Sequence, residues 1–299
     1  MKIYIHVAKE DWIIDRIASE FSRRWEDYIT DDPREADVIW MLSPSPVNAL
    51  NTPVVVSIQH IDHTKYNPAF YSALNNSTTC FLTPCQKTKE YMQSKDEITK
   101  EITVLPYWLN SSLWSFVHKK TARALLNIPS DKFIVGSFQR DTEGSDLESP
   151  KLSKGPDRFC DYVEKLKKLG KDVHVLLGGW RRQYVINRLT EKGIPFTYLE
   201  KPAISKVNLM YNACDLYVVG SRYEGGPQAI LECAATKTPI VSTDVGIANE
   251  ILHPKCVIDI ENTIHFPTPE EVLFAYDKVM ERTLDKDLGY IEFFRGLVK

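Results

Sequence analysis

GSRYEGGPQAILECAATKTPIVSTDVGIANEIL, residues 220–252, is the stretch that decides the fold class of this 299-residue chain. The apolar run Leu216–Val219 before it predicts a buried strand. Pro227 suits the first position of a helix, and the residues from Gln228 to Thr236 include good helix formers. The stretch therefore predicts a strand, a loop and a helix, which is the repeating unit of parallel α/β sheets.

The loop between this strand and helix has the chemistry of a phosphate site. Free amides of the first helical turn and the helix dipole favour an anion there, and glycines let a ligand approach the backbone closely. Glu224 and Glu232, eight positions apart, add carboxylates that accept hydrogen bonds from sugar and ribose hydroxyls. These features predict a nucleotide-sugar site. The residues expected around the anion are Gly225, Gly226, Pro227 and Gln228.

This segment resembles the donor-site signature of the family 4 glycosyltransferases. It contains two spaced acids, a second strand and a glycine turn that leads to a third acid. Members of this family are retaining enzymes of the GT-B fold, also called glycosyl transferases group 1. The resemblance continues more faintly through most of residues 132–252 and fades in the first half of the chain. The residues that carry it are Ser221, Glu224, Glu232, Pro239–Thr243, Gly246 and Glu250.

The resemblance implies an α/β fold of two Rossmann-like domains facing each other across a cleft. It also implies transfer of a sugar from a nucleoside-diphosphate sugar to an acceptor hydroxyl, with the anomeric configuration retained. Glu224 would hold hydroxyls of the donor sugar, and Glu232 would hold the ribose. The alternatives are an interaction of Glu224 with the helix dipole and a solvated helix face for Glu232.

Retention has two possible routes. One passes through a covalent sugar intermediate on a carboxylate. In the other, the acceptor attacks the face from which the phosphate departs, and a phosphate oxygen takes the proton. We favour the second route because the strongest signals in the sequence are phosphate-binding.

An arginine and a Lys-Gly pair lie where the resembled family grips the donor diphosphate. Arg140 follows the predicted strand Phe133–Phe138, and Lys154 ends a polar loop in which Lys151 competes for the same role. Cations there would stabilise the charge that develops on the leaving diphosphate. Arg140, Lys154 and the helix terminus would thus replace a metal ion, so no metal and no cofactor besides the donor co-substrate are expected.

His60 is the second catalytic candidate, after Glu224. It follows the predicted strand Val54–Gln59, and in the resembled enzymes a histidine here lies near the reacting sugar and the acceptor. A purely structural histidine is the alternative. His60 and His63 together lack an apparent third ligand for a metal site.

The first loop departs from the family pattern, because Ala8-Lys9-Glu10-Asp11-Trp12 stands where members often carry Gly-Gly. The departure leaves the acceptor type open, and Trp12 and the Ser43–Val47 loop are candidates for the acceptor pocket. Asp285-Lys286-Asp287 matches the Asp-x-Asp pattern of metal-dependent sugar transferases. It follows a helix in a charged tail, so we expect it to be solvated.

Strand and helix signals alternate along the chain, which predicts parallel sheets with helical crossovers. We expect an acceptor-binding domain over residues 1–116 and a nucleotide-sugar-binding domain over residues 117–285. Residues 286–299 are expected to pack back on the first domain.

Composition indicates which partners and which cellular location to expect for the protein. A net charge of −3 gives no bulk attraction to nucleic acid. The start of the chain lacks the features of a signal peptide, and six scattered cysteines favour a cytoplasmic location. Short basic clusters leave weak peripheral membrane contact open. The expected partners are the nucleotide-sugar donor and a glycan, lipid or small-molecule acceptor.

Two alternative functions fit the same residues. A nucleotide-sugar epimerase of this architecture would convert the donor without an acceptor. A non-catalytic nucleotide- or glycan-binding module would carry a degenerate acceptor half, and the missing Gly-Gly loop keeps this alternative open.

Overall fold

The computed structural model describes residues 1–9, 13–47 and 51–298. Its contacts divide the chain into two compact units: Met1–Asn110 with Arg282–Lys299, and Ser111–Glu281. The units therefore divide at residues 110 and 281, whereas the sequence patterns place the divisions at 116 and 285. Residues 10–12 of the unusual first loop, Trp12 among them, lie outside the described residues.

The first unit contains a parallel sheet whose described strands follow chain order. A parallel bridge joins Ile3 to Ile29, while the other edge of the same strand pairs Ile3 with Val38. After β1 the chain therefore first runs to the side of β1 where Ile29 lies. It then crosses to the other side of β1, where it forms the remaining strands. The strands are β1 (Ile3–His6), β2 (Val38–Met41), β3 (Val54–Ser57), β4 (Cys80–Thr83) and β5 (Ile102–Val104).

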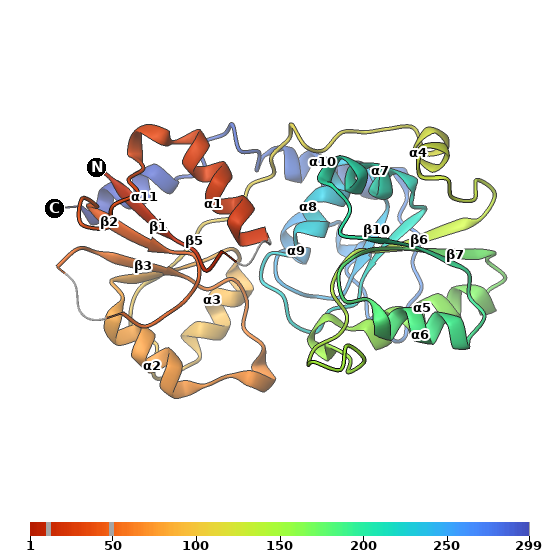
Figure 1. Cartoon of the computed structure of the whole chain (residues 1–299), viewed down its shortest axis with the longest axis horizontal. Helices are drawn as coiled ribbons and strands as arrows, with labels where there is room; N and C mark the ends of the chain where they lie inside the picture. The colour runs from red at the N-terminus through yellow and green to blue at the C-terminus, as the bar shows by residue number, and fades with distance from the viewer. Residues whose placement is uncertain (10–12, 48–50, 299) are drawn as a thin grey trace. The chain divides into compact units, whose positions relative to one another are not determined.

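This reversal explains the helical layers of the first unit. Right-handed crossovers in opposite directions place their helices on opposite faces of a sheet. Accordingly, α1 (Ile13–Arg24) covers one face, and α2 (Pro68–Ser77) and α3 (Gln86–Gln93) cover the other (Figure 1). Short 3₁₀ turns lie at Glu26–Tyr28 and His63–Lys65.

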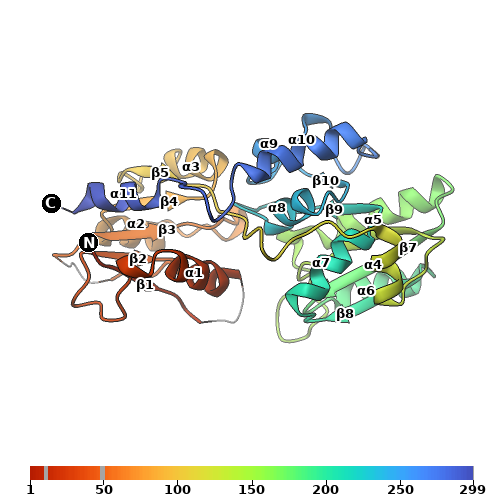
Figure 2. The ribbon, with the colours of Figure 1, turned by 90° about the horizontal axis from the view of Figure 1, so that it is seen from above.

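An aromatic cluster fills the α1 side of this sheet. Phe21 is fully buried, and its ring centroid lies 4.9 Å from that of Trp40 and 5.7 Å from that of Tyr290. Tyr290 and Phe294 belong to α11 (Tyr290–Leu297), so the last helix of the chain completes the core of the first unit. The returning segment is drawn in dark blue in Figure 2.

The second unit also holds a parallel sheet, and its described strands run in the order β10-β9-β6-β7-β8. The strand β6 comes first in the chain but lies in the middle, so the direction of winding reverses between β6 and β9. The strands are β6 (Phe133–Ser137), β7 (Val173–Gly179), β8 (Phe196–Glu200), β9 (Leu216–Val219) and β10 (Ile240–Ser242).

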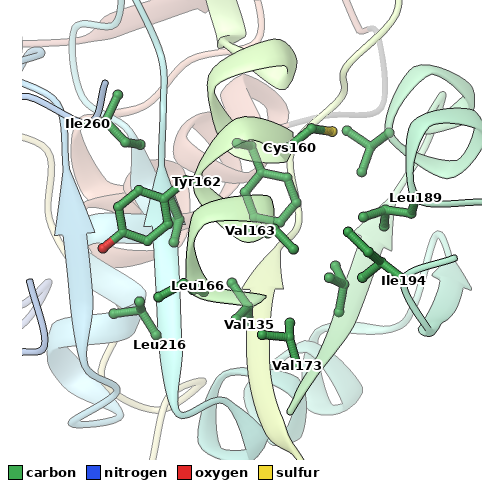
Figure 3. Close-up of a cluster of buried hydrophobic side chains, with 14 of the residues drawn as sticks. Val135, Cys160, Tyr162, Val163, Leu166, Val173, Leu189, Ile194, Leu216 and Ile260 are labelled. Atoms are coloured by element: carbon green, nitrogen blue, oxygen red, sulfur yellow. The ribbon is translucent and has the colours of Figure 1, made fainter. Parts of the chain in front are cut away.

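Helices cover both faces of the second sheet. One layer consists of α5 (Pro156–Lys168) and α6 (Gln183–Glu191), whose buried side chains pack on β6, β7 and β9 (Figure 3). The helices on the opposite side are visible in Figure 1. They are α4 (Lys119–Leu126), α7 (Ile204–Ala213), α8 (Gln228–Ala235), α9 (Ala248–Ile251) and α10 (Pro269–Met280), with 3₁₀ turns at Leu152–Lys154 and Pro254–Cys256.

The predicted α/β class with two parallel sheets is confirmed. The sequence patterns missed α2, although Asn67 caps that helix by accepting from the Phe70 amide and Pro68 occupies its first turn. Its short apolar face, with mainly Leu74 buried, gives a weak helical period. Pro227 proves to be the N-cap of α8 rather than its first residue.

The aromatic cluster makes α11 a testable part of the first unit. Phe294→Ala should lower the free energy of unfolding of that unit by about 3–5 kcal/mol, because it removes a fully buried ring. Denaturant unfolding followed by the fluorescence of the neighbouring tryptophans measures the effect. The matched control is Phe293→Ala, in the same helix but only partly buried, with an expected loss of about 1 kcal/mol. Equal losses would contradict the packing of α11.

Candidate active site

The residues expected to bind the donor follow β6 and β9, the strands between which the second sheet reverses. In open α/β sheets, ligands bind beyond the carboxyl ends of the strands at such a reversal. The loop after β6 carries Gln139 and Arg140, and the loop after β9 carries Ser221 and Glu224. The topology therefore gathers the predicted donor residues of the second unit at one end of its sheet.

Lys154 and Glu224 form the central ion pair of this site. The Lys154 Nζ donates to both carboxylate oxygens of Glu224, at 2.7 Å each. The Ser221 hydroxyl donates to Oε1 of the same carboxylate at 3.1 Å. The two charged side chains are 20% and 9% exposed, so the pair is largely shielded from water but still reachable. The structure thus brings together two residues that the sequence placed 70 positions apart.

Backbone contacts that only glycine permits hold this arrangement. Gly155 has a φ of +61°, and a Cβ added there would lie 1.9 Å from the carbonyl oxygen of Gly220. Gly246 has a φ of +48°, and its added Cβ would lie 1.8 Å from the carbonyl oxygen of Gly225. The loop after β9 is therefore held between two glycine-bearing turns.

Polar contacts reinforce the position of Lys154. The Gln139 side-chain amide donates to the Lys154 carbonyl at 2.8 Å. The Arg222 guanidinium forms two parallel hydrogen bonds to the Asp157 carboxylate, at 2.8 and 2.6 Å. The Arg222 amide also donates to the Ser153 carbonyl at 2.8 Å. The turn that carries Lys154 is thereby attached to the loops after both β6 and β9.

Arg140 has different contacts. Its Nε donates to the Thr142 carbonyl at 2.7 Å, and its guanidinium lies over the Trp180 ring, 5.9 Å from the centroid. Burial and the nearby Arg181 lower the pKa of Arg140. Trp180 also meets Arg181 and Lys201, so three cations surround one half-exposed ring. This cationic cluster was not anticipated from the sequence.

Beneath these loops lies a buried ion pair that sequence reasoning missed. Arg182 is fully buried, and its Nε donates to Asp141 at 2.8 Å. Its Nη1 donates to the carbonyls of Ser137 and Gly178, the last residue and the penultimate residue of β6 and β7. Arg182 thus ties the ends of two neighbouring strands together. No local signal marks such a pair, because its members are 41 positions apart.

Glu232 is buried in α8, with 7% of its surface exposed, and its Oε2 accepts from the Tyr211 hydroxyl at 2.7 Å. Burial and the Glu232 charge raise the pKa of Tyr211 well above its usual value, so the hydroxyl stays protonated and donates. The alternative of a solvated helix face for Glu232 is wrong. Ribose recognition by Glu232 stays a prediction.

The predicted anion-binding residues lie at the start of α8, which begins at Gln228 after the N-cap Pro227. Gly225 and Gly226 occupy the loop before it, and Gly225 is the residue whose carbonyl meets Gly246. The helix axis therefore presents its N-terminal end next to the Lys154–Glu224 pair. This arrangement agrees with the residue types expected around an anion.

Two histidines of the first unit, His60 and His63, lie after β3. His60 follows Gln59, whose side chain donates to the Leu42 carbonyl at 3.1 Å. His63 stacks on Tyr91 with 3.7 Å between ring centroids, and burial and Lys95 lower its pKa. In the described parts of the chain, neither histidine belongs to a metal-ligating group of three. The catalytic role of His60 stays a prediction.

The carboxylates of the Asp-x-Asp pattern near the C-terminus accept hydrogen bonds from residues of their own segment. The Asp287 carboxylate accepts from the Gly289 amide at 2.8 Å, just before α11 begins. The Thr283 side chain donates to Asp285 and lowers the pKa of that carboxyl.

Comparison with known proteins bears on this site directly. The family model described as glycosyl transferases group 1 matches residues 147–281. The match includes Lys154, Glu224 and Glu232, whereas Arg140 and His60 lie outside it. No curated protein matches the sequence.

Solved structures resemble the chain over nearly its whole length. HepE of Anabaena, solved in complex with UDP and glucose, has a TM-score of 0.71 at 14% identity, covering 99% of this chain and 98% of that one. A glycosyltransferase of Rickettsia africae ESF-5 has a TM-score of 0.68 at 14% identity, with 98% and 84% covered. Sucrose-phosphate synthase of Thermosynechococcus elongatus has 0.59 at 16%, with 98% and 76% covered.

The described residues include no helix long and apolar enough to cross a bilayer.

The glycine contacts yield a prediction for the second unit. Gly155→Ala should lower the free energy of unfolding by about 2–4 kcal/mol, because left-handed strain adds to a backbone clash with Gly220. The matched control is Gly170→Ala, since Gly170 also has a positive φ but nothing lies within 4 Å of an added Cβ. That control should lose about 1 kcal/mol in the same denaturant titration. A larger loss at Gly170 than at Gly155 would refute the contact.

Proposed function

Because the model of glycosyl transferases group 1 matches residues 147–281 and the fold is similar to that of HepE, we propose that the chain is a group 1 glycosyltransferase. It would transfer a sugar from a nucleoside-diphosphate sugar to an acceptor hydroxyl, retaining the configuration and using no metal ion. The observation that carries this proposal is the Lys154–Glu224 pair at the reversal of the second sheet. HepE has been solved with UDP and with UDP-glucose, which supports a nucleotide-sugar donor.

The donor diphosphate is proposed to lie at the N-terminal end of α8. Backbone amides there carry partial positive charge, and Gly225 and Gly226 let phosphate oxygens approach them. Lys154 and Arg140 add full positive charges, which supports binding of the diphosphate without a cation. Arg140 would leave the Thr142 carbonyl to reach a phosphate, whereas Lys154 already faces the site from its turn.

Glu224 is proposed to hold the donor sugar. Lys154 and Ser221 both donate to its carboxylate, which fixes the orientation of the group. A carboxylate already bound by an ammonium group at two oxygens is a poor nucleophile, so this contact favours same-face attack over a covalent intermediate. In that route the acceptor oxygen bonds to the anomeric carbon as the diphosphate leaves, and a phosphate oxygen takes the acceptor proton.

Two further residues have proposed roles. Tyr211 holds the Glu232 carboxylate in one orientation, as recognition of ribose hydroxyls requires. His60 would act near the acceptor from the first unit. The acceptor is proposed to be a glycan, lipid or small molecule, in a cytoplasmic enzyme with at most peripheral membrane contact.

Substitution of Glu224 tests the proposed role in transfer. Glu224→Gln should lower kcat by about 10²- to 10³-fold, because the charge that orients the sugar and pairs with Lys154 is lost. Affinity for the nucleoside diphosphate should change little. Steady-state kinetics and calorimetry measure the two quantities, with the surface variant Glu261→Gln as control. Unchanged transfer in Glu224→Gln would remove this residue from the mechanism.

The diphosphate role is tested with Arg140. Arg140→Ala should weaken binding of the nucleoside diphosphate about 10- to 100-fold, as expected for a charge-assisted contact, and leave nucleoside binding nearly unchanged. Calorimetry with both ligands separates the effects. Lys201→Ala is the matched control, since Lys201 also lies over Trp180. Equal losses for both ligands would refute a contact between Arg140 and the diphosphate.

A further inference from the structure

A second group of chemically reactive side chains lies in the C-terminal part of the second unit. Cys256 ends the 3₁₀ turn Pro254–Cys256, His265 lies in the following loop, and Glu271 lies in the first turn of α10. The Cys256 Sγ, an imidazole nitrogen of His265 and a carboxylate oxygen of Glu271 all lie within 4.8 Å of one another. None of these residues has a part in the proposed transfer reaction.

The spacing of these atoms is close to that of a tetrahedral metal site. The Cys256 Sγ lies 3.8 Å from the Glu271 Oε2, and the His265 Nε2 lies 2.7 Å from the same oxygen. Zinc bonds of about 2.0–2.3 Å at tetrahedral angles separate ligand atoms by about 3.3–3.6 Å. A shift of under about 1 Å in each of these two pairs, and of at most about 1.5 Å between Cys256 and His265, would therefore place all three atoms around one ion.

The charge of Glu271 supports a cation at this place. Its side chain is 6% exposed, and its Oε2 accepts from the Thr268 amide at 3.0 Å and from His265. In the described parts of the chain, neither lysine nor arginine lies within ion-pair distance of it. Two other shielded carboxylates of this unit, Asp141 and Glu224, each bind such a cation, whereas Glu232 accepts from the Tyr211 hydroxyl. A buried carboxylate normally needs a charged partner.

A small pocket borders the same group. Cys256 and Glu271 both line it, together with mostly apolar side chains that include Leu252, Val272 and Ala275. The pocket leaves room beside the sulfur and the carboxylate for their adjustment. The mostly apolar lining lowers the local dielectric constant and so strengthens electrostatic interactions with an ion.

We propose that Cys256, His265 and Glu271 bind one zinc ion. A thiolate, an imidazole and a carboxylate are the ligand types that zinc combines in proteins, whereas magnesium and calcium prefer oxygen alone. His253 precedes Cys256 by three positions, and its Nδ1 lies 3.8 Å from the Glu271 Oε1 and accepts from the Lys255 amide at 3.3 Å. The fourth ligand would therefore be a water molecule, or His253 after its ring moves. On binding, the Cys256 thiol releases its proton to solvent.

The ion would act as a structural staple. It would join the turn after α9 to the start of α10 and so hold α10 against the remainder of the second unit. The proposed site is independent of the sugar-transfer site, because it needs neither donor nor acceptor.

The test uses the full-length, tag-free chain, reduced and stripped of metal with a chelator. Zinc titration with elemental analysis should give one ion per chain. Cobalt(II) should give tetrahedral absorption and a thiolate-to-cobalt charge-transfer band of single-thiolate intensity. Zinc at a hundred times its dissociation constant should raise the melting temperature by about 5–10 °C.

Variants assign the site. Cys256→Ser and His265→Gln should each weaken zinc binding at least tenfold, and Cys256→Ser should remove the charge-transfer band. The matched control is Cys160→Ser, which alters another buried cysteine of the same unit and should leave both signals intact. Far less than one zinc per chain, or a cobalt spectrum without a thiolate band, would overturn the proposal without any variant. A thiolate band that survives in Cys256→Ser would overturn it as well.

Discussion

The proposed donor site depends on one backbone contact, the approach of Gly155 to the carbonyl of Gly220. At that distance no side chain fits between the two chains, so the turn before α5 lies directly on the end of β9. The contact places Lys154 over the loop that carries Glu224, and the ion pair follows from it. Gly246 closes the same loop from its other side. The position of the Lys154–Glu224 pair is thus set by backbone contacts at Gly155, Gly220 and Gly246 rather than by long side chains.

The acids of the second unit show how the fold manages buried charge. Glu224 is neutralised by Lys154, and Asp141 by the fully buried Arg182. Glu232 instead accepts a hydrogen bond from the Tyr211 hydroxyl, which burial keeps protonated. The two ion pairs therefore lie in different environments. The Lys154–Glu224 pair is partly exposed where a ligand would bind, whereas the Arg182–Asp141 pair is buried and connects the ends of two strands. A buried charge without such a partner would destabilise the fold by several kcal/mol.

The first unit is organised by its aromatic core rather than by a polar network. Residues from both ends of the chain meet there, because Phe21 of α1 contacts Tyr290 and Phe294 of α11. A buried carboxylate, Glu20, accepts from the Trp108 indole at 2.8 Å and from Asn110 at 3.1 Å, which fixes the end of that unit's continuous segment. The last helix is thus part of the structural core and not an appendage.

Local sequence patterns predict much of the secondary structure of this protein. Short apolar runs between helix signals predict buried parallel strands, and Leu216–Val219 and Ile240–Ser242 occur where the pattern places them. The order of turn residues around Gly225 and Gly226 predicts a strand-loop-helix unit and, through its spaced acids, the family. Those features depend on neighbours in sequence, so they are visible without coordinates. The helix α2 was not predicted because its apolar face is short and produces only a weak helical periodicity in the sequence.

Tertiary structure decided the rest, because the decisive partners are far apart in the chain. The ion pair of Lys154 with Glu224 joins residues 70 positions apart, and the close approach of Gly155 to Gly220 lies beside it. The pairing of Arg182 with Asp141, the burial of Glu232 against Tyr211 and the convergence of Cys256, His265 and Glu271 leave no periodic trace. A sequence states which side chains are available, whereas only the packing of strands and helices sets which of them lie within hydrogen-bonding distance.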